Sequence, residues 1–424
     1  MGKQSAMQRI FDNAIRQIKP EQEIFREADD KIAEINSLLK KNNINAECMA
    51  GGSYAKGTIL KDDFDIDLFV RFGYEYKSKE SQEISILLGK ALAPLKPILV
   101  HGSRDYYQIK CKFKKKSLLF EIIPVLMIDN YKEAVNVTDM SPLHVGYAHS
   151  HFEKNSGMAD QVRLAKQFCK AAGIYGAESY IRGFSGHVLD MLIIFYGSFE
   201  QLLIQASLWG SRVIIDIEKH LKDPLKQLNK SKTQSPLIIV DPVQPDRNAA
   251  AAVSREKFEI FKKKAREFIL KPKIEFFQVK KLDLKELEFN SKCENLILLK
   301  AKPLDGNEDV VGAKVLKCFE HIESHLKGND FKILSSGWEF GIDESFLYYI
   351  IKKEKMSDTV MLQGPPVKQK KDAERFRQKH KKIIAKDNRL FCEEKRKYKA
   401  PEQLVKHLLK EAYVKERVKK IKML

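Results

Sequence analysis

The sequence predicts an α+β protein made of several domains. The chain has 424 residues, more than a single hydrophobic core usually serves. Hydrophobic residues make up 43% of it, enough to bury substantial cores. Helical periodicity and short strand-like apolar runs both occur along it, and no internal repeat is visible. Two to three domains are therefore expected.

The first third of the chain should combine a long helix with strands. After Pro20, apolar residues recur at helical spacing up to Leu39, and a proline at this point suits a helix N-terminus. A short strand is expected at 46–50. The run 118–126 also reads as a strand, and it carries Glu121 between two apolar residues.

Two further regions of different sequence pattern follow. Residues 160–172 and 185–199 show helical patterns, and 237–243 reads as a strand that ends at Asp241. From about residue 256, lysine-rich helices mix with strands such as 295–299 and 346–351. The stretch 364–371 is typical of a linker and precedes a strongly basic tail, which is expected to be helical.

The charge balance favours a polyanionic partner. Lys and Arg number 76 against 57 Asp and Glu, a formal net charge of +19. Basic side chains in such excess can displace counterions from a phosphate backbone. An even scatter of lysines that serves only solubility is the alternative.

Cysteine usage and hydropathy predict a cytoplasmic protein that does not contact a membrane. The six cysteines lie far apart and form no CxxC pair, which argues against a zinc ribbon or a disulfide framework. The first residues contain no apolar segment of the signal-peptide type. The longest apolar run, 188–195, is interrupted by Asp190 and is too short to cross a bilayer.

The stretch GGSYAKGTILKDDFDIDLFV, residues 51–70, carries the clearest chemistry. Its first half is similar to a phosphate-binding P-loop, but Lys56 precedes Gly57 where that motif needs Gly-Lys-Thr. In its second half, Asp65 and Asp67 lie two residues apart in a strand and therefore point to the same face. Neighbouring carboxylates repel each other, so cations between them would justify the arrangement.

Two further features strengthen the cation interpretation. Gly52 and Ser53 stand just upstream, where a glycine turn lets backbone N–H groups and a hydroxyl approach a phosphate. Glu121 supplies a third carboxylate inside an apolar strand, where an unpaired charge would be costly. A salt-bridged sheet residue is the alternative for Glu121.

This order of motifs resembles the DNA polymerase β-like nucleotidyltransferases, and the P-loop interpretation is rejected because the Walker lysine is missing. Longer motifs follow in order between about residues 50 and 366: GSYAKGT, DIDLFV, FEIIP, SPLH, LAKQFCKAAGIYGAE, IRGFSG, IIFYGSF, VDPVQPDRNAAA and GPPV. Together they are similar to the archaeal-type (class I) CCA-adding tRNA nucleotidyltransferases.

The resemblance implies a fold and a domain plan. A polymerase β-like nucleotidyltransferase sheet domain is expected at 1–140, a helical central nucleotide-binding domain at 141–257, and an α+β C-terminal tRNA-binding body and tail at 258–424. The partner implied is tRNA, held by its acceptor arm and elbow through backbone charge and A-form shape. A homodimer is left open.

The resemblance also implies roles for individual residues. Asp65, Asp67 and Glu121 would be the catalytic carboxylates that hold two Mg²⁺ ions, although the family commonly has Asp at the third position. The residues that match nucleotide-binding positions of the family are Gly52, Ser53, Lys56, His144, Lys166, Tyr175 and Arg247. Many relatives carry Arg in place of Lys56, and a lysine keeps the charge but loses the bidentate fork.

The reaction implied is template-independent addition of CCA to the 3′ end of tRNA from CTP and ATP, with release of pyrophosphate. The tRNA 3′-hydroxyl would attack the α-phosphate, assisted by the two metal ions. Arg247 would lie beside the incoming base, because its planar fork can bond to base acceptors and phosphates. A purely structural ion pair of Arg247 with Asp241 or Asp246 is the alternative.

Two other functions stay open at this point. The nearer is another RNA terminal nucleotidyltransferase, such as a poly(A) polymerase-like enzyme, which would use one nucleotide and would not stop after three additions. The other is a catalytically silent RNA-binding homologue. The three intact carboxylates argue against the silent protein, since it has no need to keep them together.

Overall fold

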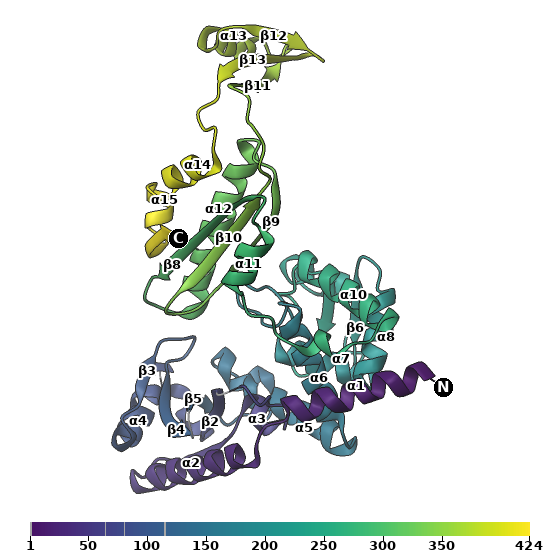
Figure 1. Cartoon of the computed structure of the whole chain (residues 1–424). Coiled ribbons are helices and arrows are strands. Elements are labelled where there is room, and N and C mark those ends of the chain that lie inside the picture. The colour runs from purple at the N-terminus through teal and green to yellow at the C-terminus, as the bar shows by residue number, and fades with distance from the viewer. Residues whose placement is uncertain (1, 64, 80, 114–115) are drawn as a thin grey trace. The chain divides into compact units, whose positions relative to one another are not determined.

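The computed structural model describes residues 2–63, 65–79, 81–113 and 116–424. The chain divides into two compact units, Met1–Lys280 and Lys281–Leu424. Figure 1 shows the helices and strands of both, and each unit is described by itself.

The first unit begins with a five-stranded mixed sheet of order β1-β2-β5-β4-β3. Its strands are β1 (Ala46–Ala50), β2 (Asp65–Phe72), β3 (Ile98–Val100), β4 (Tyr106–Phe113) and β5 (Lys116–Leu126). The central pair β2–β5 is parallel, and the other neighbouring pairs are antiparallel. In β2, Ile66, Leu68 and Val70 are fully buried, so the side chains between them face away from this core.

Two helices, α2 (Gln22–Lys41) and α4 (Ser81–Leu92), pack their apolar side chains into the core of the sheet. The helix expected after Pro20 is confirmed as α2, whose buried residues are Ile24, Ala28, Ile35 and Leu39. A short helix, α3 (Gly52–Ala55), connects β1 to β2. It contains Gly52 and Ser53, which we call the Gly-Ser turn.

The remainder of the first unit is mainly helical. Its helices are α1 (Gly2–Ile18), α5 (Ser141–Lys154), α6 (Met158–Ala171), α7 (Gly186–Tyr196), α8 (Phe199–Leu208), α9 (Pro224–Gln227) and α10 (Arg255–Leu270), with a parallel strand pair β6 (Val213–Asp216) and β7 (Leu237–Val240). The helices expected at 160–172 and 185–199 and the strand expected at 237–243 are present. The Ser185 side chain caps α7 by accepting the N–H of Val188.

The boundary between the compact units falls after Lys280, whereas a domain boundary was expected from the sequence after residue 257. Helix α10 and a 3-10 helix at Ile274–Phe277 contribute Phe258, Phe268 and Phe277 to the helical core. The rings of Phe268 and Phe277 also pack around Phe11 of α1. Aromatic burial therefore ties residues 258–280 to the helical part of the first unit.

The second unit contains two separate sheets. The larger has the order β14-β8-β10-β9 and packs on α12 and α14; the smaller has the order β11-β13-β12, with α13 packed beside it. The bounds are α11 (Leu284–Asn290), β8 (Asn295–Pro303), α12 (Glu308–Gly328), β9 (Ile333–Glu339), β10 (Ser345–Ile351), β11 (Thr359–Pro366), α13 (Lys370–Lys379), β12 (Ile383–Lys386), β13 (Arg389–Lys395), α14 (Pro401–Leu408), α15 (Ala412–Lys415) and β14 (Val418–Met423).

The linker expected at 364–371 is wrong, and the basic tail that follows is only partly helical, because strands alternate with α13, α14 and α15. Strand β11 runs through Gly364 to Pro366, and α13 begins at Lys370. The chain then returns as β12 and β13, and its last strand, β14, pairs with β8. The high local charge of this region is not typical of strands. These strands form because they pair with segments that lie far away in the sequence, which no local pattern reveals.

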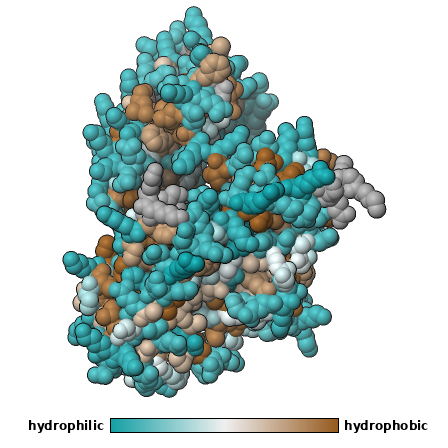
Figure 2. All heavy atoms as spheres, turned by 60° about the horizontal axis from the view of Figure 1, so that its bottom comes forward, coloured by the Kyte–Doolittle hydropathy of each residue, from teal (hydrophilic) through white to brown (hydrophobic). Residues whose placement is uncertain are grey.

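Among the described residues, no single helix is long and apolar enough to cross a membrane. Helices α7 and α8 reach that length and composition only as a pair bent by 92°, and both contribute to the helical core. On the face drawn in Figure 2, hydrophilic side chains predominate and apolar ones form small groups.

Candidate active site

Three carboxylates meet on neighbouring parallel strands of the first unit. Asp65 and Asp67 lie on the same side of β2, and Asp67 pairs in register with Glu121 of β5. On the other side of β5, Gln108 of β4 donates a hydrogen bond from Nε2 to Glu121 Oε1 at 2.8 Å. The structure thus brings together the three residues that the sequence predicts as a cation-binding group.

The electrostatics of this group favour a bound cation. Burial and the neighbouring Glu121 raise the pKa of Asp67 to about 6, although Lys56 opposes the shift. Burial also raises the pKa of Asp65, and Asp63 adds to the effect. Three carboxylates that repel each other in a partly buried site, with oxygen as the only donor atom, fit Mg²⁺.

The Gly-Ser turn packs directly against Asp67. The N–H of Gly51 donates to the Asp67 carbonyl oxygen at 2.9 Å. Gly52 has φ +47°, and a Cβ at this position would lie 1.7 Å from Asp67 Oδ2. Only glycine allows this approach. The turn belongs to α3, a helix of only four residues that leads into β2, antiparallel to β1, so it lacks the long helix that follows the loop of a P-loop.

Two lysines lie close to this turn, and both are largely withdrawn from solvent. Lys56 forms an ion pair with Asp190 of α7. Lys166 of α6 is 1% exposed, and its Nζ donates to the carbonyl and the hydroxyl of Thr58 at 3.1 and 3.2 Å. Burial lowers the pKa of Lys166 to about 8, partly opposed by Asp190. The site therefore holds concentrated positive charge beside the carboxylates.

Tyr175 lies beside Lys166. A Cβ built on Gly186 would be 3.3 Å from the Tyr175 hydroxyl and 3.5 Å from Lys166 Cε, so both side chains reach the start of α7. The Lys170 ammonium lies 5.2 Å from the centre of the Tyr175 ring. Burial raises the pKa of Tyr175 well above its usual range, so its hydroxyl stays protonated and can donate a hydrogen bond.

Asp190 was missed as a site residue. In the sequence, Asp190 reads only as an interruption of an apolar run, but its side chain is fully buried and pairs with Lys56. Its Oδ1 has no hydrogen-bond partner among the described residues. An acidic residue in the middle of an apolar helix was the available signal, because such a charge persists only when it is paired.

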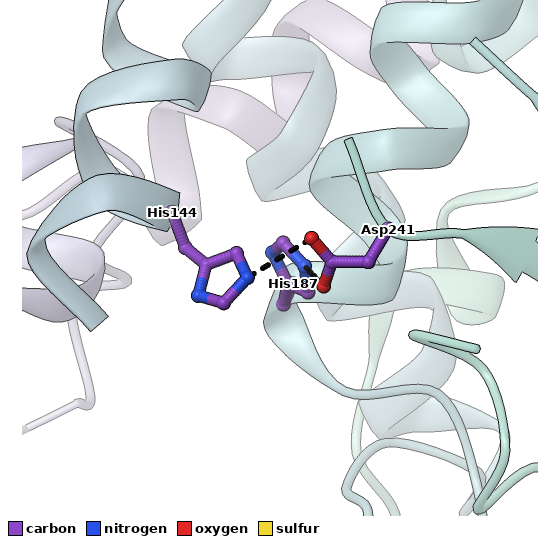
Figure 3. Close-up of side chains that lie close together, drawn as sticks. All are labelled: His144, His187 and Asp241. Carbon is purple, nitrogen blue, oxygen red and sulfur yellow. Dashed lines mark hydrogen bonds and ion pairs between the residues drawn. The ribbon is translucent and has the colours of Figure 1, made fainter. Parts of the chain in front are cut away.

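A second cluster joins three elements of the helical part (Figure 3). His144 comes from α5, His187 from α7, and Asp241 follows β7. The Nε2 atoms of His144 and His187 lie 3.0 and 3.3 Å from the two oxygens of Asp241. Neither His187 nor Asp241 was assigned a site role from the sequence, since their partners are distant in the chain.

Arg247 belongs to the same cluster. Its NH1 donates to Asp241 Oδ2 at 3.1 Å, while 43% of its side chain stays exposed. Burial opposes the ionisation of Asp241, but hydrogen bonds from His144 and His187 outweigh it and hold the pKa of this carboxyl well below its usual range. The ion pair of Arg247 with Asp241, which the sequence left open as an alternative, is present. It uses only part of the guanidinium, so other N–H groups of Arg247 can donate hydrogen bonds to a ligand.

The Asp241 cluster is better described as a hydrogen-bonded hub than as a metal centre. Its donor atoms lie within 4.8 Å of one another. However, the backbone N–H groups of Val243 and Gln244 also donate to Asp241 Oδ1 at 3.0 and 3.1 Å. With Arg247 beside it as well, the carboxylate already has five donors, and the guanidinium would repel a cation.

Helix α7 connects the two clusters. His187 and Asp190 are three residues apart and therefore project from the same face of this helix. Asp190 pairs with Lys56, and Lys56 is close enough to lower the pKa of Asp67. A continuous row of charged and polar groups thus leads from the carboxylates of the sheet to Arg247.

Comparisons with known proteins agree over most of the chain. Residues 30–125 match the family model of a nucleotidyltransferase domain, residues 160–278 that of the second domain of tRNA nucleotidyltransferase, and residues 295–421 that of the C-terminal domain of the CCA-adding enzyme. The CCA-adding enzyme of Methanocaldococcus jannaschii is 31% identical, over 92% of this chain and 88% of the relative. That of Nanoarchaeum equitans is 32% identical, over 90% and 92%.

A solved structure supports the overall fold of part of the chain. A cytoplasmic RNA terminal U-transferase is similar with a TM-score of 0.51 and 13% identity, covering 66% of this chain and 100% of that one. At this level of identity the likeness concerns the fold alone.

Proposed function

The chain belongs to the archaeal-type family of CCA-adding enzymes, and on that premise we propose how its own residues carry out the reaction. It is a tRNA nucleotidyltransferase that adds CCA to the 3′ end of tRNA. This function excludes the silent RNA-binding homologue that the sequence left open. The nucleotides that such a product requires are CTP and ATP.

The observation that carries the proposal is the register of β2 with β5, which sets Asp67 beside Glu121. In the proposed site, Asp65, Asp67 and Glu121 hold two Mg²⁺ ions. When bound, such ions favour ionisation of the attacking hydroxyl and neutralise charge on the attacking and leaving oxygens. Gly52 keeps Asp67 in place because no side chain stands between them.

The triphosphate is proposed to lie against the Gly-Ser turn. Ser53 and the backbone of Gly52 would donate hydrogen bonds, and Lys56 and Lys166 would supply charge. Asp190 holds the Lys56 ammonium within the site, so this lysine does not extend into solvent before the nucleotide arrives. The protonated hydroxyl of Tyr175 would donate to the sugar or to a phosphate oxygen.

The base is proposed to lie beside Arg247, with His144 close to the sugar. Asp241 fixes one end of the Arg247 guanidinium at 3.1 Å, and the exposed remainder can donate to the acceptors O2 and N3 of cytosine and N1 of adenine. The donor groups N1–H and N2–H of guanine would face those same donors. A fixed arginine can therefore favour C and A over G without a template.

The tRNA is proposed to bind through the second unit, by its acceptor arm and elbow. Basic residues on α13 and on the turns around it are exposed, and these are Lys368, Lys370, Lys371, Arg375, Arg377, Lys379, Lys381 and Lys382. Such a surface suits a phosphate backbone. A homodimer and a cytoplasmic location belong to the proposal as well, the latter supported by six free cysteines.

One assay tests the catalytic proposal. Purified protein is incubated with tRNA lacking CCA, with Mg²⁺ and with each nucleotide singly and together, and the RNA ends are sequenced. We expect addition of C, C and A in that order, and its loss in Asp67→Ala with tRNA affinity kept within a few-fold. Asp62→Asn, a change at an exposed residue of the turn before β2, is the matched control. Substantial turnover by Asp67→Ala would refute the metal-binding role.

A further inference from the structure

The small sheet of the second unit has almost no hydrophobic interior. We call residues 359–395 the tail module; it comprises β11, α13, β12 and β13. All of these residues are described, and the buried ones are Gly364, Ala373, Leu390 and Cys392. None of them belongs to a hydrophobic cluster of the chain. Modules of fewer than about 40 residues usually need a disulfide, a metal or a partner to hold their fold.

Three metal-ligating side chains gather where this interior would be. Strand β13 turns Leu390, Cys392 and Glu394 to one side, because alternate residues share a face. His380 follows the last turn of α13, and its Nδ1 lies 2.5 Å from Glu394 Oε1. The ligand atoms of His380, Cys392 and Glu394 all lie within 4.8 Å of one another.

We propose that His380, Cys392 and Glu394 bind one divalent metal ion of the Zn²⁺ type, which fastens α13 to β13. A thiolate, an imidazole and a carboxylate are the ligands that Zn²⁺ uses, at about 2.3 Å for sulfur and about 2.0–2.2 Å for nitrogen and oxygen. Three protein ligands leave one position for water. The inference concerns the tail module alone and does not depend on the proposed active site.

The geometry needs only a small adjustment. Ligand atoms of a tetrahedral zinc ion are about 3.4 Å apart, so the imidazole and the Glu394 carboxylate would separate by roughly 1 Å. The Glu394 side chain is 44% exposed, whereas that of His380 is 12% exposed, so the carboxylate can move. Burial raises the pKa of the Cys392 thiol. A metal ion would therefore displace its proton to solvent and bind the thiolate.

The local charges distinguish this site from the Asp241 hub. Among the described residues, Glu394 forms an ion pair with His380 and with no lysine or arginine. The hub of Asp241, by contrast, already holds Arg247. The sulfur of Cys392 also adds a soft ligand, which selects Zn²⁺ over Mg²⁺.

Cobalt substitution in the full-length protein tests the proposal, since it reports on the thiolate and not on the carboxylates of the first unit. After metal removal under reducing conditions, Co²⁺ should produce a sulfur-to-cobalt charge-transfer band in the near ultraviolet, and one equivalent of Zn²⁺ should abolish it. Cys392→Ala should lose the band. Cys293→Ala, a change at an exposed cysteine of the same unit, should keep it.

Two further variants keep the test decisive if Cys392→Ala does not fold. His380→Ala and Glu394→Gln retain the thiol and should weaken Co²⁺ binding by at least about tenfold. Zn²⁺ should also slow tryptic cleavage of α13, which is rich in Lys and Arg, in the parent protein and in Cys293→Ala. The proposal is overturned if no band forms in the parent protein. A band that is unchanged in Cys392→Ala, or in both His380→Ala and Glu394→Gln, overturns it as well.

Discussion

A single methyl group at Gly52 is predicted to abolish nucleotide addition while leaving the fold largely intact. In Gly52→Ala the new Cβ would lie 1.7 Å from Asp67 Oδ2 and 2.7 Å from its Cγ, whereas Cβ contacts below 3.0 Å essentially never occur. The carboxylate oxygen must therefore retreat by at least about 1.3 Å. A short polar side chain can turn away without breaking the sheet, so the displacement falls on the site and much less on stability.

The size of the effect follows from that displacement. Misplacing a catalytic group by about 1 Å costs roughly 10²-fold in rate, and Gly52→Ala should reduce kcat by at least that factor. The left-handed backbone at φ +47° adds a cost of about 1–2 kcal/mol for any residue with a Cβ. The thermal unfolding midpoint should thus fall by only a few degrees.

Gly57→Ala is the matched control. Gly57 lies just beyond the other end of α3 and has φ +64°, but a Cβ there would meet no atom within 4 Å. It carries the same backbone strain without the clash, so it should lose similar stability and keep its activity within a few-fold. Single-turnover addition of the first C to tRNA lacking CCA, together with thermal unfolding, separates the two effects. Equal loss of activity in both variants, or a Gly52→Ala enzyme within tenfold of the parent, would refute the argument.

Three other predictions concern charge. Without metal, the pKa of Asp67 in the folded protein is raised to about 6. The folded state therefore favours the protonated carboxyl group, so the contribution of Asp67 to stability is complete below about pH 4 and is lost as the pH rises through 6. Asp67→Asn should therefore raise the free energy of unfolding of the metal-free protein by about 3 kcal/mol at pH 7 and by much less at pH 4. Urea unfolding that shows equal gains at both pH values would contradict this prediction. Arg247→Ala should reduce kcat/KM for CTP and ATP and narrow their advantage over GTP and UTP by about 1–3 kcal/mol; unchanged discrimination on tRNA ending before C, after C and after CC would assign Arg247 a structural role. Replacing Lys370, Lys371 and Arg375 of α13 with Gln should lower the magnitude of the log K versus log salt slope for tRNA by up to about 0.9 per lost phosphate contact; an unchanged slope would mean that α13 does not touch the RNA.

The last of these tests depends on a structural correction. Deleting everything after Gly364 would remove β14 and α14, which build the main sheet and core of the second unit. Such a truncation would unfold the unit and would not isolate its charge. Substitutions on the exposed side of α13 leave the core untouched.

The sequence predicted the parts of the fold that depend on local pattern. The helix after Pro20 and the alternation around Asp65 and Asp67 are short-range signals, and both are present in the structure. The prediction of a linker at 364–371 is wrong, because Pro366 of β11 pairs with Arg389 of β13 and no local pattern records a pairing between segments this far apart in the chain.

The site shows the same division. Asp65, Asp67 and Lys56 lie within one motif and could be read together. The partners that complete their surroundings, Asp190 and Asp241, come from other elements and were not assigned site roles. Burial of Asp190 beside Lys56 is a tertiary contact between residues 134 positions apart, and a single sequence does not encode such a distance in any visible period.

The parallel pairing of β2 with β5 has a consequence during synthesis. Strand β1 precedes β2 in the chain and can pair with it early. The strand that pairs with the other edge of β2 is β5, which is synthesised only after α4, β3 and β4. A ribosome adds roughly 5–20 residues per second, so β2 spends several seconds with one edge open. Its run Ile66 to Val70 is almost wholly apolar. A nascent chain that stalls before residue 126 therefore presents an unpaired apolar strand, and it is a natural client for chaperones.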